Sequence, residues 1–357
     1  MAVTQSEFGI TQTGEACTLY TITNASGNSV SVMDYGAAIQ SILLKDKNGE
    51  TVDVALGYDT VTPYEHDGCC FGAVCGRVAN RIANAGFELN GSHYQLDDND
   101  GPNCLHGGFH GFHRCMFSAQ IKSEDNTVVF TRISEDGEGG FPGTLNVGVA
   151  YIFDDFDRLI IDYWAQSDAE TPVNLTNHTY FNLNGHDSGN IFDHQLQIFG
   201  GSYTPIADFS IPTGEIVSVK GTPLDFIEPA RLGPAITSKD PIITAVNGID
   251  HNFCVPGDAM KNMAILYSEK SGIRMYCCSD MPGVQVYTGN FIGDRMAKGG
   301  ASYHNFQGIA LETQFYPDSV NKPMFPNTIL KPGEMYHHTT TYEFENDAEL
   351  AALENVE

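Results

Sequence analysis

The stretch TPVNLTNHTYFNLNG, residues 171–185, combines strand-forming residues with side chains that could bind a ligand or move a proton. Side chains alternate along a strand, so Thr176, His178, Tyr180 and Asn182 share one face, which has no aliphatic residue. A lone histidine in a strand is most often structural. Here an amide, a hydroxyl and an aromatic ring share its face, and this favours a hydrogen-bonding surface on which His178 could act as an acid or base.

A second candidate is the glutamate in ALETQFYPD, residues 310–318. Alternation places Ile309 and Leu311 on one face and Glu312 with Gln314 on the other. A glutamate in a strand is more often a solvated surface residue. Glu312 would have a functional role only if something on that face depends on its charge.

Two further stretches carry polar groups in unusual settings. In GRVANRIANAGFEL, Asn80 and Arg81 lie among apolar neighbours, and arginine is rare in this chain. Arg81 either holds a loop to one of the many acids or presents its planar set of donors to a ligand or a carboxylate. In GIDHNF, residues 248–253, Asp250 either closes an Asx turn or serves a site.

The stretch LHGGFHGFH, residues 105–113, contains His106, His110 and His113. Spacings of four and three would place them on one helix face and suggest a metal site. Three glycines in nine residues argue against a helix, and the motif holds no acidic or cysteine ligand. We therefore predict no metal, and a glycine-rich loop that brings one histidine close to a ligand.

The elements that must position these residues are strands. β-Branched and aromatic residues alternate with turn residues along most of the chain, with hairpins expected at 87–96 and 264–278 and a short helix within 238–246. The predicted fold is all-β, a large antiparallel β-sandwich. We expect a single domain over residues 1–345, followed by an acidic tail, 346–357, that is helical or frayed.

Composition excludes several classes of partner. The 357 residues carry a formal net charge of −27, with 18 Lys and Arg against 45 Asp and Glu. Such a chain repels phosphate backbones and anionic lipid, so nucleic acid and membrane partners are not expected. The N-terminus shows no secretion signal, and nine cysteines without a C-x-x-C pair indicate reduced, buried thiols in a cytoplasmic protein, the vicinal Cys69 and Cys70 included.

Taken together, the sequence resembles the galactose mutarotase (aldose 1-epimerase) family. The residues that carry the resemblance run in order from about 76 to 334: NRIANAGFELNG, GPNCLHGG, PVNLTNHTYFNLNG, GIDHNF, PGVQVYTGN and ALETQFYPDSVNKPMFPNTILKPGE. The resemblance implies the large supersandwich of that family, with a sugar on its concave face and no cofactor. It also implies residue roles: Glu312 is the catalytic base, His178 the catalytic acid, and the substrate-binding residues are Asn80, Arg81, His106, Asp250 and Gln285.

The implied activity is the interconversion of α and β anomers of a free aldose such as galactose or glucose. Four alternatives differ in substrate or chemistry: a sugar-binding module without catalysis, a 1-epimerase that prefers disaccharides such as maltose or lactose, a glycoside hydrolase, and an epimerase of phosphorylated sugars. The presence of both a candidate acid and a candidate base disfavours the first. The preferred sugar, the choice between monomer and homodimer, and the roles of His110 and of His113, where relatives commonly carry an acidic or other polar residue, stay open.

Overall fold

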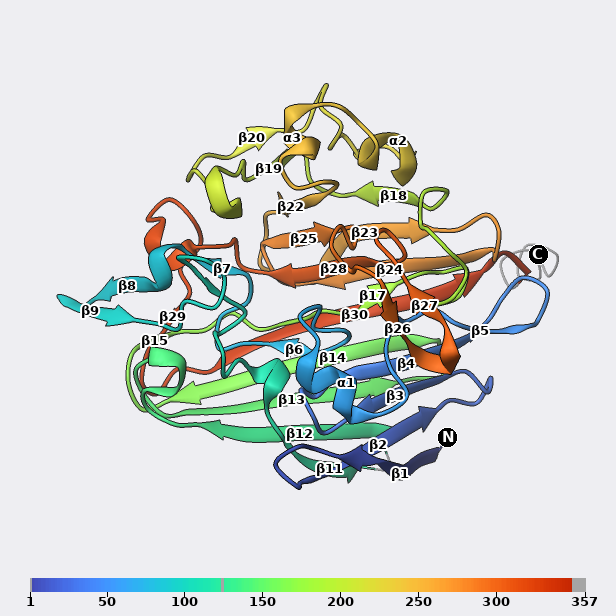
Figure 1. The fold of residues 1–357 in the computed structure, drawn as a ribbon, viewed down its shortest axis with the longest axis horizontal. Coiled ribbons are helices and arrows are strands. Elements are labelled where there is room, and N and C mark those ends of the chain that lie inside the picture. Colours follow the sequence, from blue (N-terminus) through green and yellow to red (C-terminus); the bar gives the residue numbers. More distant parts are fainter. Residues whose placement is uncertain (1, 123–124, 349–357) are drawn as a thin grey trace.

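The computed structural model describes residues 2–122 and 125–348, and three antiparallel sheets dominate it (Figure 1). The N-terminal sheet contains, in spatial order, β1 (Ala2–Ile10), β2 (Ala16–Thr23), β3 (Ser29–Met33), β4 (Ile39–Lys45) and β5 (Thr51–Asp53). The largest sheet contains, in spatial order, β11 (Ser118–Lys122), β12 (Thr127–Ser134), β13 (Leu145–Phe153), β14 (Arg158–Ser167), β30 (Tyr336–Asn346), β24 (Ile273–Ser279), β23 (Lys261–Tyr267), β18 (Gln195–Ile198) and β21 (Ala230–Arg231). The third contains β17 (Tyr180–Phe181), β28 (Ile309–Gln314), β25 (Gly283–Tyr287), β22 (Asp250–Cys254), β19 (Ser202–Tyr203) and β20 (Val217–Ser218).

Short elements connect and flank these sheets. Two-stranded pairs are formed by β6 (Val74–Cys75) with β16 (Thr176–Asn177), β7 (Arg81–Ile82) with β10 (Cys104–Leu105), β8 (Gly86–Leu89) with β9 (Ser92–Gln95), β15 (Thr171–Pro172) with β29 (Ile329–Leu330), and β26 (Arg295–Met296) with β27 (Ser302–Tyr303). The α-helices are α1 (Val61–His66), α2 (Leu232–Ile236) and α3 (Pro241–Thr244). Within the described residues, every helix is too short or too polar to cross a membrane.

One hydrophobic core joins the three sheets. It runs from Tyr20 on β2 to Phe344 on β30 and includes buried side chains of the third sheet such as Leu311. Strands β14 and β24 alternate between buried and partly exposed residues, as expected for a sheet with one face on the core. All six residues of β28 are buried, so this strand is covered on both faces.

The predicted architecture is confirmed: the protein is a β-sandwich with little helix. Both predicted hairpins are present as β8–β9 and β23–β24, and α3 forms inside the stretch expected to hold a short helix. Asp240 caps α3 by accepting a hydrogen bond from the backbone N–H of Ile242. The predicted C-terminal helix lies, except for residues 347 and 348, outside the described residues.

The strand expected within residues 171–185 is interrupted. The stretch forms the short strands β15, β16 and β17, and the backbone leaves the strand pattern at His178 and Thr179. The cause is Asn177, whose side-chain oxygen accepts hydrogen bonds from the backbone N–H and the hydroxyl of Thr179 and so competes with strand pairing. Both faces of the stretch are buried.

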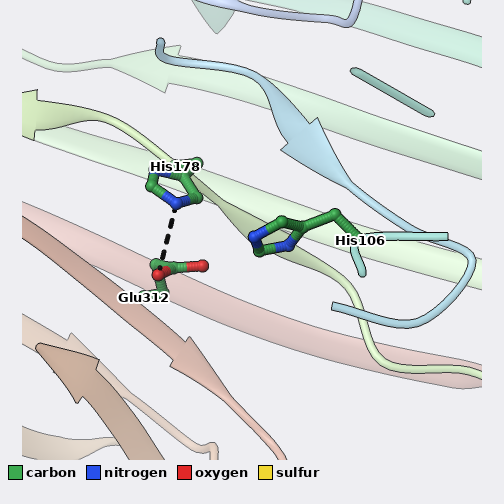
Figure 2. A group of neighbouring side chains, drawn as sticks. All are labelled: His106, His178 and Glu312. Atoms are coloured by element: carbon green, nitrogen blue, oxygen red, sulfur yellow. Dashed lines mark ion pairs between the residues drawn. The ribbon is translucent and has the colours of Figure 1, made fainter. Parts of the chain in front are cut away.

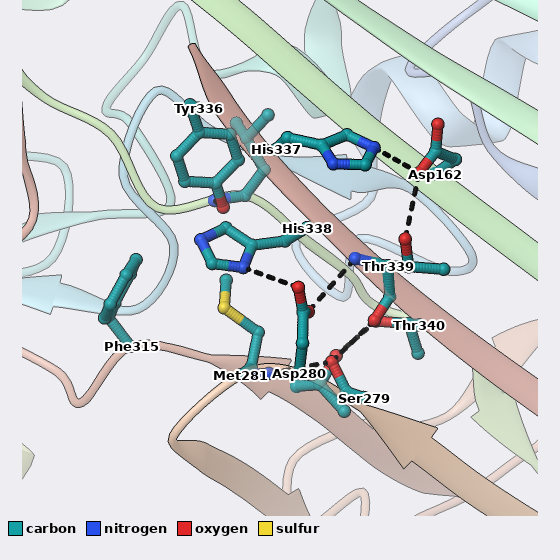
Figure 3. A network of polar contacts seen from close by, with 12 residues as sticks. Asp162, Ser279, Asp280, Met281, Phe315, Tyr336, His337, His338, Thr339 and Thr340 are labelled. Carbon is teal, nitrogen blue, oxygen red and sulfur yellow. Dashed lines mark hydrogen bonds and ion pairs between the residues drawn. The ribbon is translucent and has the colours of Figure 1, made fainter. Parts of the chain in front are cut away.

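A polar network fastens β30 to its neighbours (Figure 3). His337 pairs with Asp162 on β14, and His338 pairs with Asp280 just after β24. At the start of β30, the Tyr336 hydroxyl accepts a hydrogen bond from the backbone N–H of Leu175. The central strand of the largest sheet therefore also holds the segment that leads into His178.

Arg77 holds in place the segment that leads to Asn80 and Arg81. Its guanidinium is 2% exposed and donates to the backbone oxygens of Ser134, Pro142 and Gly143, while its own backbone oxygen accepts from Asn174. Burial lowers the pKa of Arg77 to about 10, which leaves it charged at neutral pH. This anchor sets the position of the chain that continues to Asn80 and Arg81.

We expect Arg77→Met to lower the free energy of unfolding by about 2–4 kcal/mol, because several buried carbonyls would lose their donor at once. Urea denaturation measures the change. Arg158→Met is the matched control: Arg158 is half-exposed and pairs with Asp154 four residues away, so its loss should cost less than about 1 kcal/mol. Equal losses in the two variants would contradict the anchoring role of Arg77.

Candidate active site

The outer face of the third sheet supplies two rows of functional side chains. Register pairs Gln285 on β25 with Glu312 on β28, and alternation places Asp250 and Tyr287, which pair with each other, on the same face. Ala310 on β28 pairs with Tyr180 of β17 on one side and with Tyr287 of β25 on the other. Residues from four adjacent strands therefore face one side, while Leu311 between them points into the core.

His178 and Glu312 meet on this face (Figure 2). His178 Nε2 lies 3.5 Å from Glu312 Oε1, and both side chains are almost completely buried. The His178 ring stacks on Tyr180 at 4.9 Å between centroids and meets His106 edge to face at 5.3 Å. The structure thus brings together the two residues that the sequence analysis named as acid and base.

Burial changes how Glu312 titrates. The pKa of Glu312 is raised to about 7: removal from water raises it most, the nearby His178 opposes the rise, and the negative charge of Asp250 adds to it. A carboxyl with this pKa exchanges protons readily at neutral pH, as a general base must.

Several buried polar atoms of the pair and its neighbour lack partners. Among the described residues, Glu312 Oε2, His178 Nδ1 and Gln285 Oε1 make no hydrogen bond. Buried polar atoms normally have a hydrogen-bond partner, and leaving such an atom without one costs about 1–3 kcal/mol. A hydroxyl-rich ligand that donates and accepts would complete these contacts.

His106 reaches the same place from the glycine-rich loop. The pairing of β7 with β10 sets Arg81 opposite Leu105, and the backbone N–H of Asn80 donates to His106 Nδ1 at 3.2 Å. Burial lowers the pKa of His106 to about 3, so its ring is neutral. Since Nδ1 accepts, the proton of the neutral ring lies on Nε2, and His106 can only donate from that atom.

The remaining predicted residues form ordered polar contacts around the pair. Arg81 Nε donates to Asp100 at 2.8 Å, and Gln285 Nε2 donates to Asp250 at 2.6 Å. Burial raises the pKa of Asp250, while the charge of Arg81 and the bond from Gln285 lower it. Asn80 adopts a left-handed conformation (φ 60°), which turns its side chain so that the oxygen accepts from the Arg81 N–H.

These groups line one cavity of about 360 Å³, a volume in the range of small-molecule sites. Six of the seven predicted residues line it, and Gln285 supports it through Asp250. The sequence analysis placed Tyr180 on the face of His178 but gave no role to other lining residues, among them Tyr287, Phe291 and Cys70. Gln285 came from the family resemblance; alternation along the same strand would have added Tyr287, two residues later, whereas Cys70 gave no such signal.

His106, His178 and Glu312 could also hold a metal ion, since one ligand atom from each lies within 4.8 Å of the others. This group differs from the set His106, His110 and His113 considered from spacing. The loop buries His113 and exposes His110, so spacing alone did not show which residues come together.

The fold and the site define a β-sandwich protein with a buried histidine–glutamate pair in a polar cavity. Comparison with known proteins identifies the family to which this protein belongs. The sequence profile of the aldose 1-epimerase family matches residues 18–343, so the chain belongs to that family. Its relatives include galactose mutarotase from Bos taurus, 45% identical over 317 residues (88% of this chain, 90% of the relative), and aldose 1-epimerase from Escherichia coli K12, 36% identical over 335 residues (93% and 96%).

Solved structures agree with this assignment. A GalM/aldose epimerase homologue from C. elegans superposes with a TM-score of 0.85 at 29% identity, covering 92% of this chain and 98% of its own. Galactose 1-epimerase from Lactobacillus acidophilus gives the same TM-score at 27% identity, covering 97% and 99%.

The raised pKa of Glu312 has a consequence for stability. Between pH 4.5 and 7 the folded protein binds more protons at this carboxyl than the unfolded chain does, so stability falls as pH rises through this window. We expect Glu312→Gln to be more stable than the wild type by about 1–3 kcal/mol at pH 8, and by much less at pH 4.5.

Urea denaturation of both proteins at the two pH values measures this difference. The control, Glu334→Gln, changes an exposed glutamate and should alter stability by less than about 0.5 kcal/mol at either pH. A Glu312→Gln protein no more stable than the wild type at pH 8 would show that burial of the carboxylate costs nothing.

Proposed function

We propose that this protein is an aldose 1-epimerase that interconverts the α and β anomers of free aldoses such as galactose and glucose, with Glu312 as base and His178 as acid. The observation that carries the proposal is the contact between Glu312 and His178 in the cavity, 3.5 Å apart and both shielded from bulk water. Family membership supports the activity, since relatives bear the names galactose mutarotase and aldose 1-epimerase.

The geometry suits ring opening. The hydroxyl oxygen on C1 and the ring oxygen are both bonded to C1, so two groups 3.5 Å apart can reach both. Glu312 removes the proton from the C1 hydroxyl while His178 gives one to the ring oxygen, and the bond between C1 and the ring oxygen breaks. After rotation about the C1–C2 bond, the ring closes on the other face with the two roles reversed.

A single transferable proton on the pair is enough for the whole cycle. It begins on His178, moves to Glu312 by way of the sugar as the ring opens, and returns to His178 as the ring closes. Because burial raises the pKa of Glu312 to about 7, this carboxyl can hold the proton near neutral pH between ring opening and ring closure. The pair is then ready for either anomer, as a reversible isomerisation requires.

The other nominated residues hold the sugar. Neutral His106 donates from Nε2, Asp250 accepts from hydroxyls, and Gln285 fixes Asp250 and offers its unpaired oxygen. Asn80 and Arg81 add an amide and a planar donor group at the cavity wall. Proton transfer depends on this alignment, because misplaced reacting atoms lose much of the rate.

The alternatives have less support. A binding module needs neither a base with a pKa near neutrality nor an acid beside it. A glycoside hydrolase normally uses two carboxylates, and here the second carboxylate, Asp250, is tied to Gln285 while a histidine occupies the acid position.

The setting of the enzyme is also part of the proposal. One core that reaches from Tyr20 to Phe344 supports a single domain over residues 1–345. The net charge of −27 fits a neutral sugar and disfavours nucleic acid, and the reduced thiols fit the cytoplasm. We propose a monomer or homodimer that requires no cofactor.

We expect Glu312→Gln and His178→Asn each to lower kcat by roughly 10²–10⁴-fold, because each keeps a polar side chain but removes a proton-transfer group. The double variant should lose less than the product of the two single losses, since both residues act on one step. Polarimetry on freshly dissolved α-galactose, with the spontaneous rate subtracted, measures kcat.

Binding provides the control for this test. Calorimetric affinity for galactose should change far less than kcat, because the holding residues remain. A Glu312→Gln protein that converts α-galactose at the wild-type rate would overturn the mechanism. Glu334→Gln, which carries the same substitution on an exposed turn, should keep full activity.

We also expect EDTA to leave turnover unchanged, since the acid–base cycle runs on His178 and Glu312 alone. The measurement is the polarimetric rate after dialysis against EDTA, with and without added Zn²⁺ or Mg²⁺. Loss of activity on dialysis that a divalent ion restores would instead assign His106, His178 and Glu312 as metal ligands.

A further inference from the structure

An ion pair that the acid–base cycle does not use lies behind one wall of the cavity. Asp67, directly after α1, is paired with Arg295 on β26. The carboxylate is 1% exposed and the guanidinium side chain 27%, so the pair is largely shielded from water. The three residues that follow Asp67, namely Gly68, Cys69 and Cys70, line the cavity, whereas the paired residues themselves do not. The pair is therefore next to the site without being part of it.

Asp67 holds the start of this wall through the backbone. Its Oδ1 accepts a hydrogen bond from the N–H of Cys69 at 3.0 Å, and the same oxygen contacts Arg295. Arg295 also donates to the hydroxyl of Tyr58 at 3.3 Å, so the guanidinium is held from two sides. The pair thus fastens the wall of the cavity to a strand that lies 228 residues further along the chain.

A row of aromatic rings leads from Arg295 to the proposed acid. The guanidinium lies over the ring of Phe71, 5.9 Å from its centre. Phe71 is fully buried and meets Tyr180 edge to face, with 5.0 Å between the ring centres. Tyr180 in turn stacks on His178, with 4.9 Å between the ring centres and 30° between the ring planes. Because protein interiors are closely packed, a displacement of Arg295 would reach His178 through these rings.

The backbone makes a second connection to the proposed acid. The N–H of Gly72 donates to the backbone oxygen of His178 at 3.0 Å, and the N–H of His178 donates to the oxygen of Ala73 at 2.8 Å. Asn177 Nδ2 also donates to the oxygen of Gly72, at 2.7 Å. The segment that follows Asp67 therefore holds the backbone of His178 as well as its ring.

We propose that Arg295 and Asp67 are positioning residues that fix the place of the acid, His178. This inference rests on the function proposed above, in which His178 gives a proton to the ring oxygen of the sugar. Desolvation offsets most of the attraction within a buried ion pair, so the pair adds little to stability and mainly restricts where its partners lie. Proton transfer needs that restriction, because a displacement of about 1 Å at the reacting atoms can cost roughly a hundredfold in rate.

Kinetics on the full-length protein test the proposal. We expect Arg295→Met to lower kcat by about tenfold to a hundredfold, measured by polarimetry on α-galactose. Calorimetric affinity for galactose should change far less, because the residues that hold the sugar remain, and binding also shows that the variant is folded. The control Arg231→Met removes a half-exposed arginine that pairs with Asp193, and it should keep full activity. An unchanged kcat in Arg295→Met would overturn the proposal.

Two conservative variants show which part of the pair matters. Arg295→Lys keeps the positive charge beside Asp67 but lacks the planar group over Phe71, so its kcat should lie between that of the wild type and that of Arg295→Met. Asp67→Asn keeps an oxygen that can accept from the Cys69 N–H but loses the charge that holds Arg295, so it should also lower kcat. If both conservative variants keep the wild-type kcat, the ion pair has no positioning role.

A double variant separates positioning of the acid from general damage to the fold. If Arg295 acts through His178, then Arg295→Met should have little further effect on the residual kcat of His178→Asn, measured at raised enzyme concentration. The two losses should therefore be far from additive in free energy. A loss in the double variant equal to the product of the two single losses would show that Arg295 acts independently of His178, and this would contradict the proposal.

The NMR signal of the His178 ring gives a readout that does not depend on turnover. Because this ring stacks on Tyr180, the ring current of Tyr180 shifts the signal, which is assigned by its absence in His178→Asn. The signal should move in Arg295→Met and in Asp67→Asn, and stay in place in Arg231→Met. An unmoved signal in Arg295→Met would overturn the positioning role. A signal that moves, in a protein whose wild type converts no sugar, would support the placement and overturn only the epimerase proposal.

Discussion

The whole arrangement depends on keeping one carboxylate away from water. Glu312 lies on a strand that is buried on both faces, and this burial raises the pKa of Glu312 to about 7. Shielding on the inner side comes from the core between the sheets, and on the outer side from the loops that carry His106, Asn80 and Cys70. Burying this carboxylate costs free energy, and the rest of the fold offsets that cost through a core that spans three sheets and through anchors such as Arg77.

Much of the fold could be predicted from sequence, because alternation is a local signal. The two hairpins, the short helix at Pro241 and the orientation of Glu312 opposite Leu311 all followed from residues close together in the chain. The break in the strand at Asn177 did not, because a side chain that hydrogen-bonds its own backbone competes with pairing in a way that residue propensity does not show.

In the candidate site, too, some residues could be predicted from sequence motifs and others could not. Motifs that resemble those of a family led to the seven nominated residues, and the structure places them around one cavity. Cys70 belongs to no such motif, although it lines the same cavity. From sequence, the vicinal cysteines among apolar residues indicated reduced, buried thiols. The left-handed conformation of Cys70 and its place in the cavity wall appear only in three dimensions.

The position of β30 in the largest sheet bears on how the protein is made. This last described strand lies between β14 and β24, in the middle of the sheet rather than at its edge (Figure 1). During synthesis, strands on either side can form before it, but each group then presents an open edge to solvent and to other chains. A nascent chain that has reached Gln314 contains every residue of the proposed site and still lacks the strand that joins the two halves. Catalytic competence should therefore arise abruptly, once β30 has joined the sheet, and the interval before it is the one in which a chaperone would matter most.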